Sequence, residues 1–330
     1  MPDLLNDLPD YRHLDVAATA PSRDPGGDGD VQRRAVLRNL GLAGIAASDA
    51  ARQSLTEALG LDDADGWEGV AREYALSFYT TPPRRLLGDL TADLVVLQGG
   101  ISGRRGGARA VMCRAAGQLA AVAAMAWAST GDTRRARHWW RTARQAGDQS
   151  GCVATRMWVR GWEVADGLYE QRPVSAVLDG AAEAIAVGGR TVCAGTAGLY
   201  AGLAQTLAAA GRKADALRAL RRVAEVTDRL PSSVVADEES MLGWPEVRLR
   251  HTESYVYTAL GESAVAYAAQ DRALALYPPA LVRERAAMLL HRATCMVSDG
   301  DVAGGLRFAT ATLDGLPVKH RTELVHAVGR

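Results

Sequence analysis

The stretch GWPEVRLRHTESYVYTALGE, residues 243–262, brings together side chains that could do chemistry. Arg248, His251 and Tyr255 follow one another at spacings of three and four, so they share one side of a helix. A guanidinium, an imidazole and a phenol on one side suit the binding of a small molecule or a peptide. Alternatively, Arg248, His251 and Glu253 form a local ion network that holds the preceding insertion, residues 230–247.

Catalysis is the weaker interpretation of this stretch. His251 and Glu253 are two positions apart, so they do not share a helix face. The sequence contains no HExxH or GxSxG motif, no Walker motif and no GxGxxG motif in a strand context. We therefore expect no catalytic residue, no metal and no cofactor, and we keep a composite site from several helices as an alternative.

The segments that must carry these residues are Ala- and Leu-rich and repeat about every forty residues. Doublets that suit tight turns recur at intervals of 40, 40, 50 and 39 residues: Gly131-Asp132, Gln171-Arg172, Gly211-Arg212, Gly261-Glu262 and Gly300-Asp301. A small residue follows five positions later, at Ala136, Ala176, Ala216, Ala266 and Gly305. The pattern predicts an all-α fold, a right-handed α-solenoid of tetratricopeptide-like helix hairpins.

The same repeat divides the chain into three parts. Residues 1–30 carry seven Asp and two Arg, and we expect a disordered acidic arm there. Residues 31–107 form a helical lead-in, and residues 108–330 hold about five helix pairs. Within the lead-in we expect helices over 66–79 and 82–98. The glycine-rich run GGISGRRGG, residues 99–107, is expected to be a flexible break.

The repeat register also predicts which side chains face a common concave groove. Most of them are small or apolar, and the polar groups come from the fourth repeat. The predicted ligand-binding residues are Gln118, Met125, Trp158, Gln205, Trp244, Arg248, His251, Tyr255 and Thr294.

Charge is balanced overall and uneven locally. The chain has 38 basic and 38 acidic residues, which argues against a nucleic-acid footprint over the whole chain. Residues 101–160 nevertheless carry eleven Arg and two Asp. This block is either a set of solvated helix faces or a surface for an acidic partner. The predicted partner-binding residues are Arg134, Arg135, Arg137, Arg141 and Arg144.

Cysteine usage and hydropathy predict a cytoplasmic protein. The four cysteines contain no CxxC pair and lack zinc or disulfide spacing, so we expect them to be reduced. No run of 18 apolar residues occurs, so we expect no membrane span. The segment RRAVLRNLGLAGIAAS, residues 33–48, imitates a twin-arginine export signal or forms an amphipathic first helix.

The opening stretch, followed by AYAAQDRALALYP, resembles an actinobacterial group of Xre-type transcriptional regulators. The resemblance extends through residues 283–325, and residues 31–44 and 79–94 also fit. It implies a tetratricopeptide-like region that normally follows a helix-turn-helix DNA-binding domain. Residues 1–30 are too short and acidic to form that domain, so we expect no sequence-specific DNA binding by this chain alone.

Three functions follow from these patterns and this resemblance. The first is a regulatory module that binds a small molecule or a peptide in the groove. The second is a protein–protein interaction scaffold that uses the arginine block, and a homodimer is compatible with either. The third is an enzyme or accessory protein of a biosynthetic pathway, recruited from this family.

Overall fold

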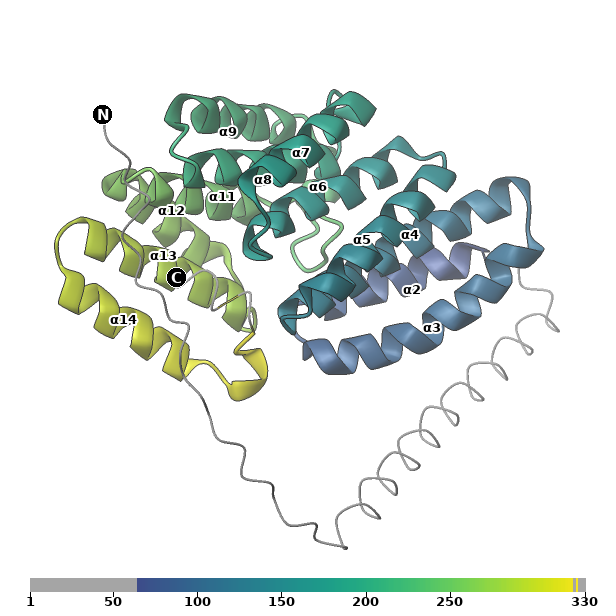
Figure 1. The fold of residues 1–330 in the computed structure, drawn as a ribbon, viewed down its shortest axis with the longest axis horizontal. Coiled ribbons are helices and arrows are strands. Elements are labelled where there is room, and N and C mark those ends of the chain that lie inside the picture. The colour runs from purple at the N-terminus through teal and green to yellow at the C-terminus, as the bar shows by residue number, and fades with distance from the viewer. Residues whose placement is uncertain (1–63, 323–324, 326–330) are drawn as a thin grey trace, which may run out of the picture. The chain divides into compact units, whose positions relative to one another are not determined.

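The computed structural model describes residues 64–322 and Val325, and its regular structure is helical (Figure 1). Among these residues there are thirteen α-helices, one short 3-10 helix and no strand. The prediction of an all-α fold is therefore confirmed. The acidic arm predicted at 1–30 and the twin-arginine segment at 33–48 lie outside the described residues.

The described part of the chain begins with two helices, continues with five consecutive helix hairpins and ends near a 3-10 helix. The first two helices are α2 (Ala64–Ser77) and α3 (Pro83–Gly103), and the last element is η1 (Val318–His320). The hairpins are α4 (Gly106–Ser129) with α5 (Thr133–Gln149), α6 (Val153–Tyr169) with α7 (Val174–Gly188), α8 (Ala194–Ala209) with α9 (Lys213–Thr227), α11 (Glu246–Ala259) with α12 (Ser263–Leu276), and α13 (Val282–Ser298) with α14 (Val302–Gly315).

The five doublets found in the sequence lie in the five hairpin turns, and the turns share one backbone conformation. The first residue of each doublet has a positive φ, from 56° at Gln171 to 102° at Gly300. The N–H of the second residue bonds to a carbonyl five positions earlier, as from Arg212 to Leu207 at 2.9 Å. This is the bond that closes a Schellman motif, and glycine is favoured because it reaches a positive φ without strain.

Small residues pack the second helix of a hairpin against the first, with one exception to the prediction. Ala136, Ala216 and Ala266 are fully buried. Ala176 is exposed, and Val177 is buried in its place. The reason is Pro173, which caps α7, so that this helix begins two residues after its doublet instead of one.

The break predicted at residues 99–107 is much shorter in the structure. Helix α3 continues through Gly103, and α4 begins at Gly106. Gly100 is buried against α4, where an added Cβ would lie 2.3 Å from Cε of Met112. This glycine therefore permits a close helix contact, whereas the prediction read it as a sign of flexibility. Both α2 and α3 pack mainly on α4 and touch each other less.

The first helices of successive hairpins pack on one another. Contacts link α4 with α6, α6 with α8, α8 with α11, and α11 with α13. Of the described helices, α4 alone is long and apolar enough to cross a membrane, and 67% of its apolar stretch is buried inside the protein. All four cysteines are free, with Cys113 and Cys295 buried.

The insertion at residues 230–247 folds back across these first helices. It contains the short helix α10 (Ser232–Val235) and Pro245, which caps α11, so the last two residues of the insertion begin that helix. The backbone of Met241 donates to the Ala75 carbonyl at 3.1 Å and accepts from Nε1 of Trp158 at 3.1 Å. Nε1 of Trp244 donates to Oγ1 of Thr227 at 2.9 Å. The insertion is thereby tied to α2, α6 and α9.

Candidate functional site

A cavity of about 220 Å³ lies between the insertion and the first helices of the hairpins. Its lining comes from α4, α6, α8, α11 and α13, the turn after α2, the Tyr277–Leu281 link and residues near the C-terminus. Met241, Gly243 and Trp244 form the wall contributed by the insertion. The ten extra residues of the fourth repeat therefore close a pocket over the helices beneath them.

The walls of the cavity are rich in aromatic rings. Trp158 and Trp162 are four positions apart on α6, so they share a helix face, and their ring centroids lie 6.3 Å apart in an edge-to-face arrangement. Trp244, Phe78 and Tyr79 complete this aromatic lining. Such walls suit a flat apolar molecule. Aromatic rings provide large contact areas, and these side chains lose little conformational entropy when a ligand binds.

Arg248 extends from the first turn of α11 into the lining. Its Nη2 donates to the Tyr79 hydroxyl at 2.7 Å and to the Ser240 carbonyl at 3.1 Å. The guanidinium carbon lies 5.1 Å from the Trp162 ring centroid and 5.6 Å from that of Tyr79. Its Nε is buried without a hydrogen-bond partner. The cation is thus stabilised by rings and neutral oxygens.

Arg283 and Glu284, in the first turn of α13, form the neighbouring part of the wall. Arg283 is 7% exposed, and its Nη2 donates to the Phe78 carbonyl at 2.6 Å, while its Nε is buried without a partner. Oε2 of Glu284 is also buried without a partner. Burial raises the pKa of Glu284, although the positive charges of Arg283 and Arg248 oppose this shift.

A second polar group lies at the carboxyl-terminal end of α6. Oδ2 of Asp166 is buried without a partner. Burial, together with the nearby Glu170 carboxylate, raises the pKa of Asp166 well above its usual value. Burial also raises the pKa of Tyr169, which lines the same part of the cavity as Gln205. This end of the cavity is therefore polar, and burial disfavours the charged form of Asp166.

Two histidines lie close together here: His251 is half-buried in the cavity lining, and His291 is buried outside the lining. Nδ1 of His251 is 2.9 Å from the Tyr277 hydroxyl, and Nδ1 of His291 is 2.8 Å from Oγ of Ser254. Burial, with the charge of Arg248, lowers the pKa of His251 to about 4, and burial lowers that of His291 well below its usual value. Ser254 is fully buried outside the lining, so this Ser–His pair is not placed to attack a substrate.

The structure places six of the nine predicted ligand-binding residues in the lining of this cavity. They are Met125, Trp158, Gln205, Trp244, Arg248 and His251. Tyr255 lies behind the lining, where its ring packs edge-on against Tyr169 and His291. Gln118 is half-buried on α4, two turns before Met125, and Thr294 is exposed with its hydroxyl bonded to the Leu290 carbonyl.

The alternative interpretation of the opening stretch, a local ion network, is not what the structure contains. Glu253 pairs with Arg250 at 2.8 Å and not with Arg248, because residues three apart share a helix side. His251 is bound to Tyr277. Arg248 does hold the insertion, through the Ser240 carbonyl, so one part of that interpretation stands.

Several lining residues were missed by sequence reasoning. Phe78 and Tyr79 come from a turn about 200 residues before Arg283 and Glu284, and no local pattern connects them. Asp166 had a signal, because it is one of several charged residues on α6, a helix that also carries Trp158 and Trp162. A buried charged residue on an otherwise apolar helix marks either an ion pair or a site.

The arginine block divides into exposed and inward-facing side chains. Arg134, Arg137 and Arg141 on α5 are exposed and form no ion pair with any described residue. Arg135 pairs with Asp132 at 3.3 Å and stacks over the Trp127 ring. Arg144 turns inward, which leaves three free arginines of the five predicted to bind a partner.

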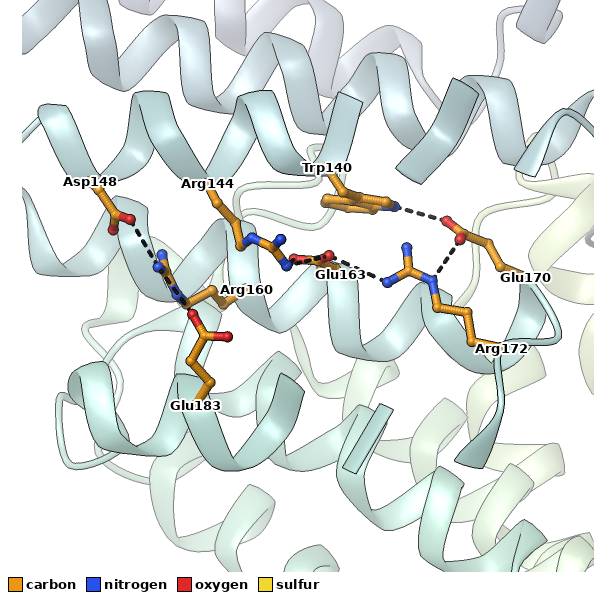
Figure 2. Close-up of polar contacts among 8 residues, drawn as sticks. All are labelled: Trp140, Arg144, Asp148, Arg160, Glu163, Glu170, Arg172 and Glu183. Carbon is orange, nitrogen blue, oxygen red and sulfur yellow. Dashed lines mark hydrogen bonds and ion pairs between the residues drawn. The ribbon is translucent and has the colours of Figure 1, made fainter. Parts of the chain in front are cut away.

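Arg144 belongs to an ion-pair network between α5, α6 and the turn that follows α6 (Figure 2). Its Nη1 donates to both Glu163 oxygens, at 2.8 and 2.9 Å. Arg172 donates to Glu163 at 3.3 Å and to Glu170 at 2.8 Å. Nε1 of Trp140 donates to Glu170 at 2.8 Å, so every carboxylate of this row holds at least two donors.

A second group of ion pairs lies beside the first and joins α5, α6 and α7, as Figure 2 shows. Arg160 pairs with Asp148 at 3.0 Å and lies 3.9 Å from Glu183. Arg156 adds a bond to Asp148 at 2.8 Å. Burial tends to raise the pKa of Asp148, but the hydrogen bonds from Arg160 and Arg156 outweigh it, and the pKa is lowered. The ion-pair network is defined below as these residues together with Arg144, Glu163, Glu170 and Arg172.

Comparison with known proteins finds no matching family model, no matching curated protein and no matching solved structure. Within the described residues, no group of three or more His, Cys, Asp or Glu side chains is placed to hold a metal ion. The resemblance to Xre-type regulators therefore stays a prediction from the sequence.

Proposed function

We propose that this chain is a regulatory protein that binds a small organic molecule in the cavity beneath the insertion. One observation carries the proposal. Four polar atoms in residues of one cavity lining are buried without partners: Nε of Arg248, Nε of Arg283, Oε2 of Glu284 and Oδ2 of Asp166. Unpaired buried polar groups cost free energy, and a ligand in this cavity would lie beside the side chains that carry these four.

The proposal includes the finer architecture, a right-handed α-solenoid of tetratricopeptide-like hairpins. Its support is the series of five hairpins with equivalent turns and the packing of each first helix on the next. In such an array, the first helices line one face, and that face provides the cavity lining here. A ligand in the cavity would contact helices from several repeats at once.

The proposal of a regulatory role rests on the sequence resemblance. It rests also on the fact that the cavity is lined by segments far apart in the sequence. The lining joins Phe78, before α3, to Thr322, after η1. A ligand that touches segments so far apart in the chain stabilises one arrangement of the repeats over others. We place this protein in the cytoplasm, which agrees with its four free cysteines.

A variant that fills the cavity tests the proposal. Gly198 lines the cavity on α8, and an added Cβ would lie 3.6 Å from the Trp244 ring, an ordinary contact. Gly198→Leu should therefore fold and occupy part of the ligand volume. Gly88→Leu is the matched control, because Gly88 is exposed on α3 with nothing within 4 Å of its added Cβ.

The measurement is ligand-observed NMR with a library of small organic fragments. We expect fragments that bind the wild type and Gly88→Leu and lose binding to Gly198→Leu. Fragments that bind all three proteins equally, or no binding fragment at all, would contradict the proposal. Urea titrations of both variants check that the loss does not come from unfolding.

An interaction scaffold is the second candidate function. Its support is the exposed row of Arg134, Arg137 and Arg141 on α5, which has no carboxylate partner among the described residues. Such a row suits an acidic protein surface and gives salt-dependent association. Binding of an acidic model peptide that weakens when all three are replaced by Ser would support the scaffold, and unchanged binding would count against it.

A further inference from the structure

We propose that the ligand of the cavity is a small organic acid, whose carboxylate pairs with Arg248 and Arg283 and whose flat apolar body lies against the tryptophans. This inference rests on the proposed function and adds the chemical class of the ligand. It follows from the charges that line the cavity, the hydrogen bonds that the two arginines leave unmade, and the size of the space.

The two cavity arginines have no negative partner within the described part of the protein. Arg248 bonds to a phenol and a carbonyl, and Arg283 bonds to a carbonyl. Neither forms an ion pair with a described carboxylate, and the Nε of each is buried without a partner. A buried cation without a counter-charge is unfavourable unless something outside the chain supplies it.

The two guanidinium groups are anchored on adjacent residues of the turn after α2. Nη2 of Arg283 is fixed on the Phe78 carbonyl, and Nη2 of Arg248 is fixed on the hydroxyl of the next residue, Tyr79. Only Nη2 of each makes hydrogen bonds within the protein. Two cations anchored at adjacent residues, with their other nitrogens unused, can converge on one carboxylate, since guanidinium and carboxylate form strong charge-assisted hydrogen bonds.

Three arginines of the ion-pair network differ from the cavity pair, because each has a carboxylate partner. Arg144, Arg160 and Arg172 each pair with Asp or Glu at 2.8–3.0 Å (Figure 2). Some of their nitrogens are also unpaired, but the charge is balanced locally. At these three positions the chain provides the paired carboxylate that it does not place on Arg248 and Arg283.

The acidic residues of the lining form no ion pair with the two arginines. Burial raises the pKa values of Glu284 and Asp166, because a buried environment disfavours the charged form of a carboxyl group. Glu238, the remaining acid of the lining, is exposed. Two arginines without an ion-paired carboxylate in one cavity lining favour an anion over a cation.

The space suits a ring with a short acidic chain. A cavity volume of about 220 Å³ has room for a small ring with a short chain. Trp158, Trp162 and Trp244 form an apolar part of the lining. An aryl-alkanoic acid would place its ring against these side chains and its carboxylate toward the arginines.

Three probes with one body and different charges test the ligand class on the unmodified protein. They are 3-phenylpropionate, 3-phenylpropionamide and 3-phenylpropylamine, which carry a negative charge, no charge and a positive charge. Isothermal titration calorimetry should show that the acid binds at least about 10-fold more tightly than the amide, because a hydrogen bond to a charged group is the stronger one. The amine should bind most weakly.

Variants of the two arginines assign that preference to the cavity. Arg248→Met and Arg283→Met should each reduce the preference for the acid over the amide about 10-fold. Arg283→Lys, which keeps a positive charge, should retain part of it. Arg84→Met is the control, because Arg84 is exposed on α3 and forms no ion pair with any described residue.

The outcomes separate this inference from the proposed function. Amide or amine binding as tight as that of the acid, with all binding lost in Gly198→Leu, overturns the ligand class and leaves the cavity as a binding site. The same holds if fragments lost in Gly198→Leu are all neutral or cationic. Acid binding that survives both arginine variants also overturns the inference. If no molecule is sensitive to Gly198→Leu, the proposed function itself fails.

Discussion

The ion-pair network between α5 and α7 and the cavity beneath the insertion both bury arginines, and they stabilise them in different ways. In the network, Glu163 is 11% exposed and accepts from Arg144 and Arg172 (Figure 2). In the cavity, Arg248 and Arg283 contact rings, a phenol and carbonyls, with no carboxylate paired to them among the described residues. Both regions therefore contain arginines, but only the arginines of the network are paired with carboxylates.

This difference separates residues that maintain the fold from residues that are available to a ligand. Removing one partner of a buried ion pair leaves the other partner as an uncompensated charge, and stability falls steeply. Removing a buried cation that has no partner eliminates a charge that was already uncompensated. Substitutions that remove a charge should therefore have different effects in the two regions. In the network they should lower the stability of the fold, and in the cavity they should weaken ligand binding.

The largest effect is expected in the network. Glu163→Gln removes the charge that Arg144 and Arg172 share, and it should lower the free energy of unfolding by about 3–5 kcal/mol. Urea denaturation at neutral pH measures it. Glu183→Gln is the control, since Glu183 is 62% exposed and lies 3.9 Å from Arg160, and it should cost less than about 1 kcal/mol. Equal losses in the two variants would contradict the distinction.

The second-largest effect is a loss of stability at acidic pH, caused by His251 in the cavity lining. The folded-state pKa of His251 is about 4, below the unfolded value near 6.5. The unfolded chain then binds the proton more tightly, so the stability from neutral His251 is complete above pH 6.5 and is lost as the pH falls toward 4. Between pH 7 and 4.5, the free energy of unfolding should fall by about 2–3 kcal/mol from this group.

Replacing the histidine isolates that contribution. His251→Gln should show a smaller loss of stability between pH 7 and 4.5 than the wild type in urea titrations. Asp148, whose pKa is lowered, loses its contribution at lower pH and does not act in this window. Identical pH profiles for the two proteins would show that His251 is not the titrating group.

A smaller effect is expected from the cavity arginines in the free protein. Arg283→Met removes one hydrogen bond to the Phe78 carbonyl and also removes an uncompensated charge, so the two contributions partly offset each other. The free energy of unfolding should change by less than about 1 kcal/mol, measured by urea denaturation beside Glu163→Gln. A loss as large as that of Glu163→Gln would place Arg283 with the structural arginines.

The smallest effect is expected on the outer face of α5. Arg137 is exposed and has no ion pair with any described residue, so Arg137→Ala should change stability by less than about 0.5 kcal/mol. Thermal denaturation at low and high salt measures it. A larger and salt-dependent loss would indicate an ionic partner for Arg137 in the native protein.

The helical fold could be predicted from the sequence because its signals are local. Each doublet gives the left-handed residue that ends a helix, and the repeat of about forty residues places the hairpins. The predicted helix boundaries and packing were wrong where a glycine or a proline had a role other than ending a helix. Gly100 permits close packing on Met112, and Pro173 delays the start of α7 by one residue.

The site could be predicted only in part. The repeat register identified side chains that share the inner face, including Trp158, Arg248 and His251. It could not identify Tyr79 or Arg283, because their meeting depends on how segments about 200 residues apart pack together. It also placed Arg144 on a partner-binding surface, because helical periodicity does not show which exposed-looking arginine finds a carboxylate on the next helix.

The central claim, that a ligand carboxylate supplies the charge missing at Arg248 and Arg283, is tested most directly by a crystal structure with 3-phenylpropionate. The account predicts a carboxylate within hydrogen-bonding distance of both guanidinium groups and a phenyl ring against Trp158, Trp162 or Trp244. A probe that binds with its carboxylate away from both arginines, or a cavity left without the probe at saturating concentration, would contradict it.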